Sequence, residues 1–234
     1  MKIIRKSLAR GAEEARGLAV VIDVFRAFSC QPLFFHLGAQ RVIPIPEPER
    51  ARKIKEQNPE FILVGEVNEA PLEGADMGNS PSQAILKGEG FFKGRTVVHR
   101  TTAGVTGAVA AAKNADQVVL GSFVTARAIA RYIKDYAPRE VTLVAMGDRA
   151  REKCPEDEAC ADYLEHLLSG GPYDPVRAFK EVVFQRTAQK FIQGRKTYLP
   201  REDPLFCLQR DVFDFVLVLD QTGEELQVLR MDMP

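Results

Sequence analysis

The sequence predicts an α/β protein of three layers, an α/β/α arrangement in which helices cover both faces of a mostly parallel β-sheet. Apolar runs rich in Val, Ile and Leu alternate along the chain with segments of helical period, which is typical of β-α-β units. Several of these runs end on polar or glycine-bearing turns, at Asp23, Glu66, Thr101, Ser122 and Asp148. Because parallel strands bring their carboxyl ends to one edge of a sheet, these turns are expected to converge on one ligand site.

The predicted strands and helices alternate through the first part of the chain. The strands lie near residues 18–23, 41–45, 61–66, 96–101, 117–121 and 141–146, and the helices near residues 26–38, 48–57, 81–88, 105–113, 125–136 and 156–169. The run RVIPIPEPER carries prolines at 44, 46 and 48, so we expect its strand to be short or at a sheet edge, with Pro48 opening the next helix.

The pattern changes after residue 172. A helix over 175–193, a short helix near 204–210 and a β-hairpin turning at Thr222 and Gly223 are expected there. We therefore predict an α/β catalytic region over residues 1–172 and a C-terminal extension over residues 173–234, packed on the main sheet as a helical and β-hairpin appendage.

Composition excludes several classes of function. The chain of 234 residues has 32 basic and 32 acidic side chains, so its net charge indicates neither a nucleic-acid nor a membrane partner. The N-terminus MKIIRKSLAR is too polar for a signal peptide, and no apolar run is long enough for a membrane span. The 4 cysteines form no CxxC pair, so we expect reduced packing thiols. We expect a cytoplasmic protein with a small-molecule substrate, and a homo-oligomer is possible.

The first candidate segment is VVIDVFRAFSC. A carboxylate at the end of a buried strand is costly unless it meets a metal, a cation or hydrogen bonds, so Asp23 can be a metal ligand or a nucleophile while Arg26 binds an anionic oxygen. A structural Asp23–Arg26 pair that caps the following helix is an equally good interpretation.

The next two segments contain helix starts that favour anions. Ser80, Pro81 and Gln83 match a capping box, with Glu66 and Asp76 nearby, and a phosphate flanked by carboxylates needs a bridging cation such as Mg²⁺. The alternative to a phosphate site is a well-capped helix whose neighbouring acidic side chains are exposed to solvent. In TVVHRTTAGVTG, small residues let a ligand approach the backbone, whereas His99 is expected to be a core histidine.

The segment that follows Asp148 carries Glu156 and Asp157 in the first turn of a helix. The helix dipole stabilises acids at such a position by about 0.3–1 kcal/mol, so either residue alone needs no functional explanation. Cys160 lies one turn further on without an identifiable histidine partner, and we expect it to be a packing residue.

These segments, in this order, resemble the 2-phosphosulfolactate phosphatase family, known as ComB. The resemblance rests on IDVFRA, GEV, GADMGNSP, TTAGVT, GSF and the Glu156–Asp157 pair after Gly147; it covers residues 18–170 and leaves the tail outside. It implies a ComB-like fold and Mg²⁺-dependent hydrolysis of a small phosphate monoester, 2-phosphosulfolactate to sulfolactate and phosphate.

The sequence departs from the family pattern at three positions. The pattern has an Arg after GE, and it has an Asn and a later Arg in the threonine-rich loop. The residues here are Val67, Ala103 and Gly107. Because a doubly acidic substrate needs paired cationic or amide donors, we expect a weaker preference for a sulfonated phosphoester. Arg100 is the residue expected to compensate if it turns toward the site.

We predict a Mg²⁺-dependent phosphatase in which Asp23 attacks the phosphoryl group or positions the attacking water. The catalytic candidates are Asp23, Arg26 and Asp76; the phosphate or substrate ligands are Asn79, Ser80, Arg100, Thr101, Thr102, Gly104 and Ser122; and the metal ligands are Asp23, Glu66, Glu156 and Asp157. The alternatives are a phosphatase for a different small phosphoester, or a weak or inactive family member that binds a phosphorylated metabolite.

Overall fold

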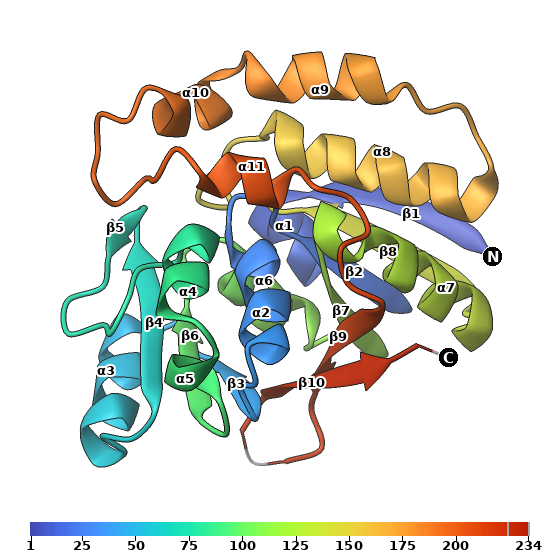
Figure 1. Cartoon of the computed structure of the whole chain (residues 1–234). Coiled ribbons are helices and arrows are strands. Elements are labelled where there is room, and N and C mark those ends of the chain that lie inside the picture. The colour runs from blue at the N-terminus through green and yellow to red at the C-terminus, as the bar shows by residue number, and fades with distance from the viewer. Residues whose placement is uncertain (224, 234) are drawn as a thin grey trace.

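A computed structural model describes residues 1–223 and 225–233 and confirms the predicted α/β class (Figure 1). The strands are β1 (Lys2–Ser7), β2 (Leu18–Ile22), β3 (Arg41–Pro44), β4 (Ile62–Val67), β5 (Ala70–Pro71), β6 (Thr96–Arg100), β7 (Gln117–Gly121), β8 (Glu140–Ala145), β9 (Phe215–Asp220) and β10 (Gln227–Asp232). The helices are α1 (Leu8–Glu13), α2 (Ala27–His36), α3 (Pro48–Gln57), α4 (Pro81–Lys87), α5 (Glu89–Phe92), α6 (Gly104–Ala111), η1 (Phe123–Thr125), α7 (Ala126–Tyr136), α8 (Pro155–Ser169), α9 (Pro175–Val183), α10 (Arg186–Ile192) and α11 (Asp203–Cys207).

Within the described residues the strands form one mixed sheet in the order β1-β8-β2-β7-β9-β10-β3-β6-β4-β5. In this order, β1, β8, β2 and β7 are parallel to one another, and so are β3, β6 and β4. The antiparallel hairpin of β9 and β10 lies between these two parallel halves (Figure 1). It pairs with β7 at Val119–Val218 and Leu120–Leu217, and with β3 at Val42–Val228.

This position corrects one expectation about the C-terminal segment. The predicted hairpin forms, but it completes the centre of the sheet instead of packing on it as an appendage. Its residues Phe215 to Leu219 are buried, because they contribute to the cores on both faces of the sheet. The division of the chain at residue 172 stays a prediction.

The helices cover both faces of the sheet, and alternate residues of each central strand face opposite cores. In β2, Ala19 and Val21 pack with α1, α2 and α6, whereas Leu18, Val20 and Ile22 pack with α7 and α8. This alternation is the period of an extended strand that is buried on both sides. A smaller core lies between α3 and the strands β3, β4 and β6.

Most predicted elements of the first part of the chain form within one or two residues of their expected bounds. The strand β3 is short, as predicted, but it lies inside the sheet between β10 and β6. The helix expected over 175–193 is broken into α9 and α10, because Gln185, the N-cap residue of α10, has an extended backbone. The sequence analysis missed β1, which pairs in parallel with β8 at the sheet edge and is largely polar and half-buried.

The cysteines agree with a further expectation, that they are packing thiols. Cys30, Cys154, Cys160 and Cys207 are free and buried, and burial raises the pKa of each thiol. In the part of the chain that the structure describes, no helix has both the length and the apolar character required to cross a membrane.

Candidate active site

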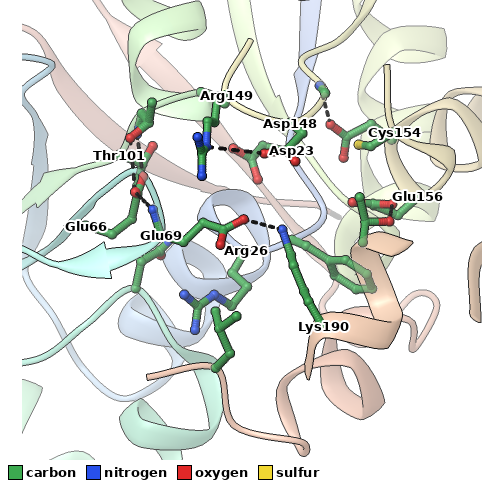
Figure 2. A pocket seen from close by; sticks show the side chains of 18 of the residues that line it. Asp23, Arg26, Glu66, Glu69, Thr101, Asp148, Arg149, Cys154, Glu156 and Lys190 are labelled. Atoms are coloured by element: carbon green, nitrogen blue, oxygen red, sulfur yellow. Dashed lines mark hydrogen bonds and ion pairs between the residues drawn. The ribbon is translucent and has the colours of Figure 1, made fainter. Parts of the chain in front are cut away.

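The turns that follow β2, β4, β6 and β8 meet at one pocket, together with α10 and the segment before α11 (Figure 2). Four of the five turns expected to converge therefore meet at this edge of the sheet, whereas the turn after β7, with Ser122, does not line the pocket. The pocket is lined by Asp23, Phe25, Arg26, Glu66, Glu69, Asn79, Thr101, Thr102, Ala103, Gly147, Asp148, Arg149, Cys154, Glu156, Asp157, Thr187, Lys190, Phe191 and Leu199.

Asp23 follows β2 directly and lies between the starts of two helices. Its Oδ1 accepts a hydrogen bond from the backbone N–H of Ala27 at 3.1 Å, and the N–H of Gly104 also donates to the carboxylate. A side chain at position 104 would come within 2.6 Å of Oδ2 of Asp23, so α6 begins here only with a glycine. Gly104 therefore supports Asp23 without lining the pocket itself.

Burial raises the pKa of Asp23 from 3.8 to about 7. The negative charges of Glu66 and Glu156 add to this shift, whereas the hydrogen bonds from Ala27 and Gly104 oppose it. A carboxyl group with this pKa exists in both protonation states near neutral pH, which suits acid–base catalysis.

Glu156 and Asp157 begin α8 and face the same pocket. Asp157 accepts from the N–H groups of Val24 and Gly147, both at 2.8 Å, and thereby joins the ends of β2 and β8. Glu156 accepts from the hydroxyl of Thr187 on α10 at 2.6 Å. Burial raises the pKa of both carboxyl groups, and the charge of Asp23 adds to the shift of Asp157.

Glu66, at the end of β4, is fixed by the threonine-rich loop. One carboxylate oxygen accepts from the N–H of Thr102 at 2.5 Å, and the other accepts from the N–H of Glu69 at 2.6 Å and the hydroxyl of Thr102 at 3.0 Å. The Thr102 donors, which the sequence analysis assigned to phosphate, therefore hold Glu66 in this structure. Thr101 also faces the pocket, and its hydroxyl accepts from the N–H of Val105.

Arg26 faces the pocket, but its carboxylate partner is Asp203 and not Asp23. Nη1 of Arg26 donates to Oδ2 of Asp203 at 2.8 Å and to the carbonyl oxygen of Tyr198 at 3.2 Å. The guanidinium also lies over the ring of Phe191. The structure thus replaces the considered Asp23–Arg26 pair with a buried ion pair to the C-terminal segment.

Asn79 is oriented by a buried histidine. His99 contacts the side-chain oxygen of Asn79 through Nε2 at 3.1 Å and the amide of Gln31 through Nδ1 at 2.9 Å. Burial lowers the pKa of His99 to about 3, so the ring stays neutral at physiological pH. His99 is a core histidine, as predicted.

Besides Gly104, four candidate residues do not line the pocket, and the side chain of each bonds to other groups of the protein: Asp76, Ser80, Arg100 and Ser122. Asp76 accepts from the N–H of Leu63 and pairs with Lys55 at 2.9 Å. The hydroxyl of Ser122 donates to the carbonyl of Phe28, at 2.8 Å. Arg100 donates to the carbonyl oxygens of Pro46 and Glu66 and to the hydroxyl of Thr102.

Ser80 caps α4 as predicted, and the anion at this helix start is a carboxylate of the protein itself. Oδ1 of Asp203 accepts from the hydroxyl of Ser80 at 2.8 Å, and from the N–H and hydroxyl of Ser82 at 3.0 and 2.6 Å. Asp203 therefore occupies the place where the sequence analysis expected phosphate.

The sequence analysis missed several residues that line the pocket. Glu69 and Arg149 belong to turns whose strands were recognised, and Arg149 directly follows Asp148 in the turn after β8. Thr187, Lys190 and Phe191 lie on α10, and only the packing of the C-terminal helices brings them to the site.

The carboxylates of the pocket fit a divalent cation. Asp23, Glu156 and Asp157 are buried carboxyl groups; the charge of Glu156 raises the pKa of Asp23 and of Asp157, the charge of Asp23 raises that of Asp157, and a cation would remove this repulsion. Among residues 1–223 and 225–233, no three His, Cys, Asp or Glu side chains form a ready-made metal site. Mg²⁺ typically takes only one or two carboxylates together with phosphate oxygens and water, so this donor set suits it.

Comparison with known proteins identifies the family. The family model described as 2-phosphosulpholactate phosphatase matches residues 4–222, so the resemblance also covers most of the tail that was expected to lie outside it. A protein of Bacillus subtilis (strain 168) named "Probable 2-phosphosulfolactate phosphatase" is 27% identical over 206 residues, which are 88% of each chain. Proteins of the same name from Clostridium novyi (strain NT) and Clostridium perfringens (strain SM101) are 34% and 32% identical; the matches cover 84% and 85% of this chain, and 86% and 84% of theirs. The chain therefore belongs to the 2-phosphosulfolactate phosphatase family, a family of phosphoric monoester hydrolases.

Proposed function

We propose that this protein hydrolyses a small acidic phosphate monoester with Mg²⁺, and that 2-phosphosulfolactate, the substrate in the names of its relatives, is such a substrate. The observation that carries the proposal is the convergence of Asp23, Glu66, Glu156 and Asp157 on one pocket, each buried at the end of a strand or the start of a helix. The family membership agrees with this chemistry.

The substrate phosphate is bound by Arg26, Asn79 and Thr101. Asp203 and Tyr198 both accept from Nη1 of Arg26, and among the described residues no hydrogen bond involves its Nε or Nη2, so these donors can bind an anionic oxygen. The contact between His99 and the oxygen of Asn79 leaves the amide N–H₂ of Asn79 for the ligand.

Asp23 is the carboxylate that acts on the phosphoryl group. It attacks phosphorus, the bond to the ester oxygen breaks and the alcohol leaves with a proton, and water then hydrolyses the aspartyl phosphate; or it takes the proton of a water molecule that attacks phosphorus directly and expels the same alcohol. Two of the carboxylates of Asp23, Glu66, Glu156 and Asp157 would hold Mg²⁺, which would polarise the phosphoryl oxygens and neutralise negative charge. Rapid quenching during turnover, followed by borohydride reduction and mass spectrometry, separates the two routes, because only an aspartyl phosphate at position 23 is reduced to homoserine.

The metal requirement is tested by chelation. Hydrolysis of 2-phosphosulfolactate and of phosphoglycolate should vanish with EDTA and return on addition of Mg²⁺ or Mn²⁺, because the pocket holds more acids than bases. Phosphate release is measured directly, with a metal-replete sample as the control. Full activity in EDTA contradicts the metal requirement, and phosphate-ester binding without any hydrolysis favours the alternative of a metabolite-binding family member.

A further inference from the structure

The wall of the pocket carries two cations, Arg149 and Lys190, that have no part in the proposed reaction. Arg149 follows β8, and Lys190 lies on α10. Figure 2 shows Lys190 reaching Glu69, whereas Arg149 enters the pocket from the opposite wall and its Nε lies 3.9 Å from Oδ1 of Asp148. Lys190 lies outside the motifs that define the family resemblance, and Arg149 lies between Gly147 and the Glu156–Asp157 pair.

The carboxylate of Glu69 lies beside Lys190. Nζ of Lys190 donates to one of its oxygens, and Nζ of Lys196 is 3.7 Å from the other. The side chain of Glu69 is only 17% exposed, and two lysine ammonium groups lie within ion-pair distance of its carboxylate. This part of the pocket therefore stabilises an anion.

Glu69 also has an unusual backbone conformation for a residue with a side chain. Asn68 and Glu69 form the turn between β4 and β5, with φ angles of 50° and 78°. A turn with two positive φ angles favours glycine at its second position, because an L side chain is strained there. The turn itself thus gives no reason for a glutamate, whereas the contact of its carboxylate with Lys190 does.

We propose that Lys190 and Arg149 form a second anion subsite, which binds the carboxylate or sulfonate of an acidic phosphoester, and that Glu69 fills this subsite when substrate is absent. The inference rests on the proposed function and names the groups that select its substrate class. On binding, the acid group of the substrate displaces the Glu69 carboxylate from Lys190.

This subsite replaces the compensating role expected for Arg100. Arg100 is committed to backbone carbonyl oxygens and does not line the pocket. Gly107, one of the departures from the family pattern, packs against Met146, whose sulfur would lie 2.3 Å from a Cβ at that position. Cations from two other segments therefore supply what the motif departures removed, and we expect the preference for acidic substrates to persist.

The test compares phosphoglycolate, which has a carboxylate beside its phosphate, with ethyl phosphate, which has none. In Lys190→Met, the ratio of kcat/KM for phosphoglycolate to kcat/KM for ethyl phosphate should fall by about 10- to 100-fold, the effect of one lost charged hydrogen bond. In Glu69→Gln the same ratio should rise, because the competing carboxylate is gone. The matched control is Lys196→Met, which removes the other lysine near Glu69; Lys196 does not line the pocket, so the ratio should stay within about twofold.

The proposal requires that Lys190→Met lowers this kcat/KM ratio and that Glu69→Gln raises it. A merely structural Lys190–Glu69 pair predicts that both substitutions shift the ratio in the same direction or not at all, and either result overturns the proposal. Arg149→Met should lower the ratio as Lys190→Met does.

A second measurement separates this inference from the proposed hydrolysis. Calorimetric titration with sulfoacetate, which carries a carboxylate and a sulfonate but no phosphate, should show binding that weakens about 10-fold or more in Lys190→Met and strengthens in Glu69→Gln. These differences in a protein that hydrolyses neither ester would uphold the subsite and refute the hydrolysis. Hydrolysis with unchanged ratios and unchanged sulfoacetate binding would refute the subsite alone.

Discussion

At the scale of single residues, the protonation of Asp23 links stability to function. Its pKa rises to about 7, first because it is buried and then because Glu66 and Glu156 repel its charge. In the unfolded chain the group ionises near its ordinary pKa of 3.8. Between these two values the folded protein binds more protons than the unfolded chain does, so ionisation of Asp23 destabilises the metal-free protein as the pH rises through this window.

Asp23→Asn should separate catalysis from stability. We expect kcat to fall by about 100-fold or more, because the variant lacks the carboxylate that acts on the phosphoryl group. In the metal-free protein, the stability that the variant gains over the native protein should be larger at pH 8 than at pH 4. The native carboxyl group is ionised at the higher pH, whereas asparagine carries no charge to bury. Urea unfolding at both pH values measures this gain. An equal difference in unfolding free energy at pH 4 and pH 8 would contradict the assigned pKa.

At the scale of elements, Asp203 joins three helices around the pocket. Asp203 lies in α11 and is fully buried. It accepts hydrogen bonds from the guanidinium of Arg26, which precedes α2, and from Ser80 and Ser82 at the start of α4. A buried carboxylate is tolerated only where cations and donors satisfy it, and Asp203 meets this condition. The C-terminal segment therefore sets the position of Arg26 in the pocket.

Asp203→Asn should destabilise the protein by about 3–5 kcal/mol, because it leaves the buried guanidinium of Arg26 without its counter-charge. Asp162→Asn is the control: it removes an exposed partner of Arg5 and should cost about 1 kcal/mol or less. Chemical denaturation measures both values. The double variant Arg26→Met with Asp203→Asn should cost less than the sum of the single variants, and strict additivity would show that the two residues do not act as a pair.

At the scale of the whole molecule, the hairpin of β9 and β10 holds the two parallel halves of the sheet together. Its contacts with the neighbouring strands are short, since β10 pairs with β3 only at Val228 and Val42 among the described residues. The turns after β2 and β8 belong to one half of the sheet, and those after β4 and β6 belong to the other. The pocket is therefore formed only when the hairpin unites both halves.

Val228→Asp should disrupt this junction, because it places an unpaired charge at a fully buried position. We expect a loss of about 4 kcal/mol or more in the unfolding free energy, or failure to fold, with loss of phosphatase activity. The control is its neighbour Leu229→Asp, which lies on the opposite side of β10, 42% exposed, and should be nearly neutral. Circular dichroism and thermal unfolding compare the two. A folded and active Val228→Asp protein would show that the junction is not needed.

The sequence by itself determined the elements of the first part of the chain and the edge of the sheet where the site lies. Apolar runs that are buried on both faces have a clear pattern, and Pro48 and the capping residue Ser80 mark helix starts as local features. Asp23 and Glu66 were identifiable because a carboxylate at the end of an apolar strand is conspicuous, whereas Glu156 and Asp157 were identified through the family resemblance.

Only the tertiary structure decided the partners of these residues. Whether Arg26 meets Asp23 or Asp203, and whether Arg100 or Lys190 faces the pocket, depends on contacts between segments more than 30 residues apart in the chain. Local periodicity also gives a hairpin the same appearance at the edge of a sheet and at its centre, because both positions require alternating apolar residues. The packing of the C-terminal segment against the sheet resolved both questions, since long-range burial and charge pairing have no local signature in a single sequence.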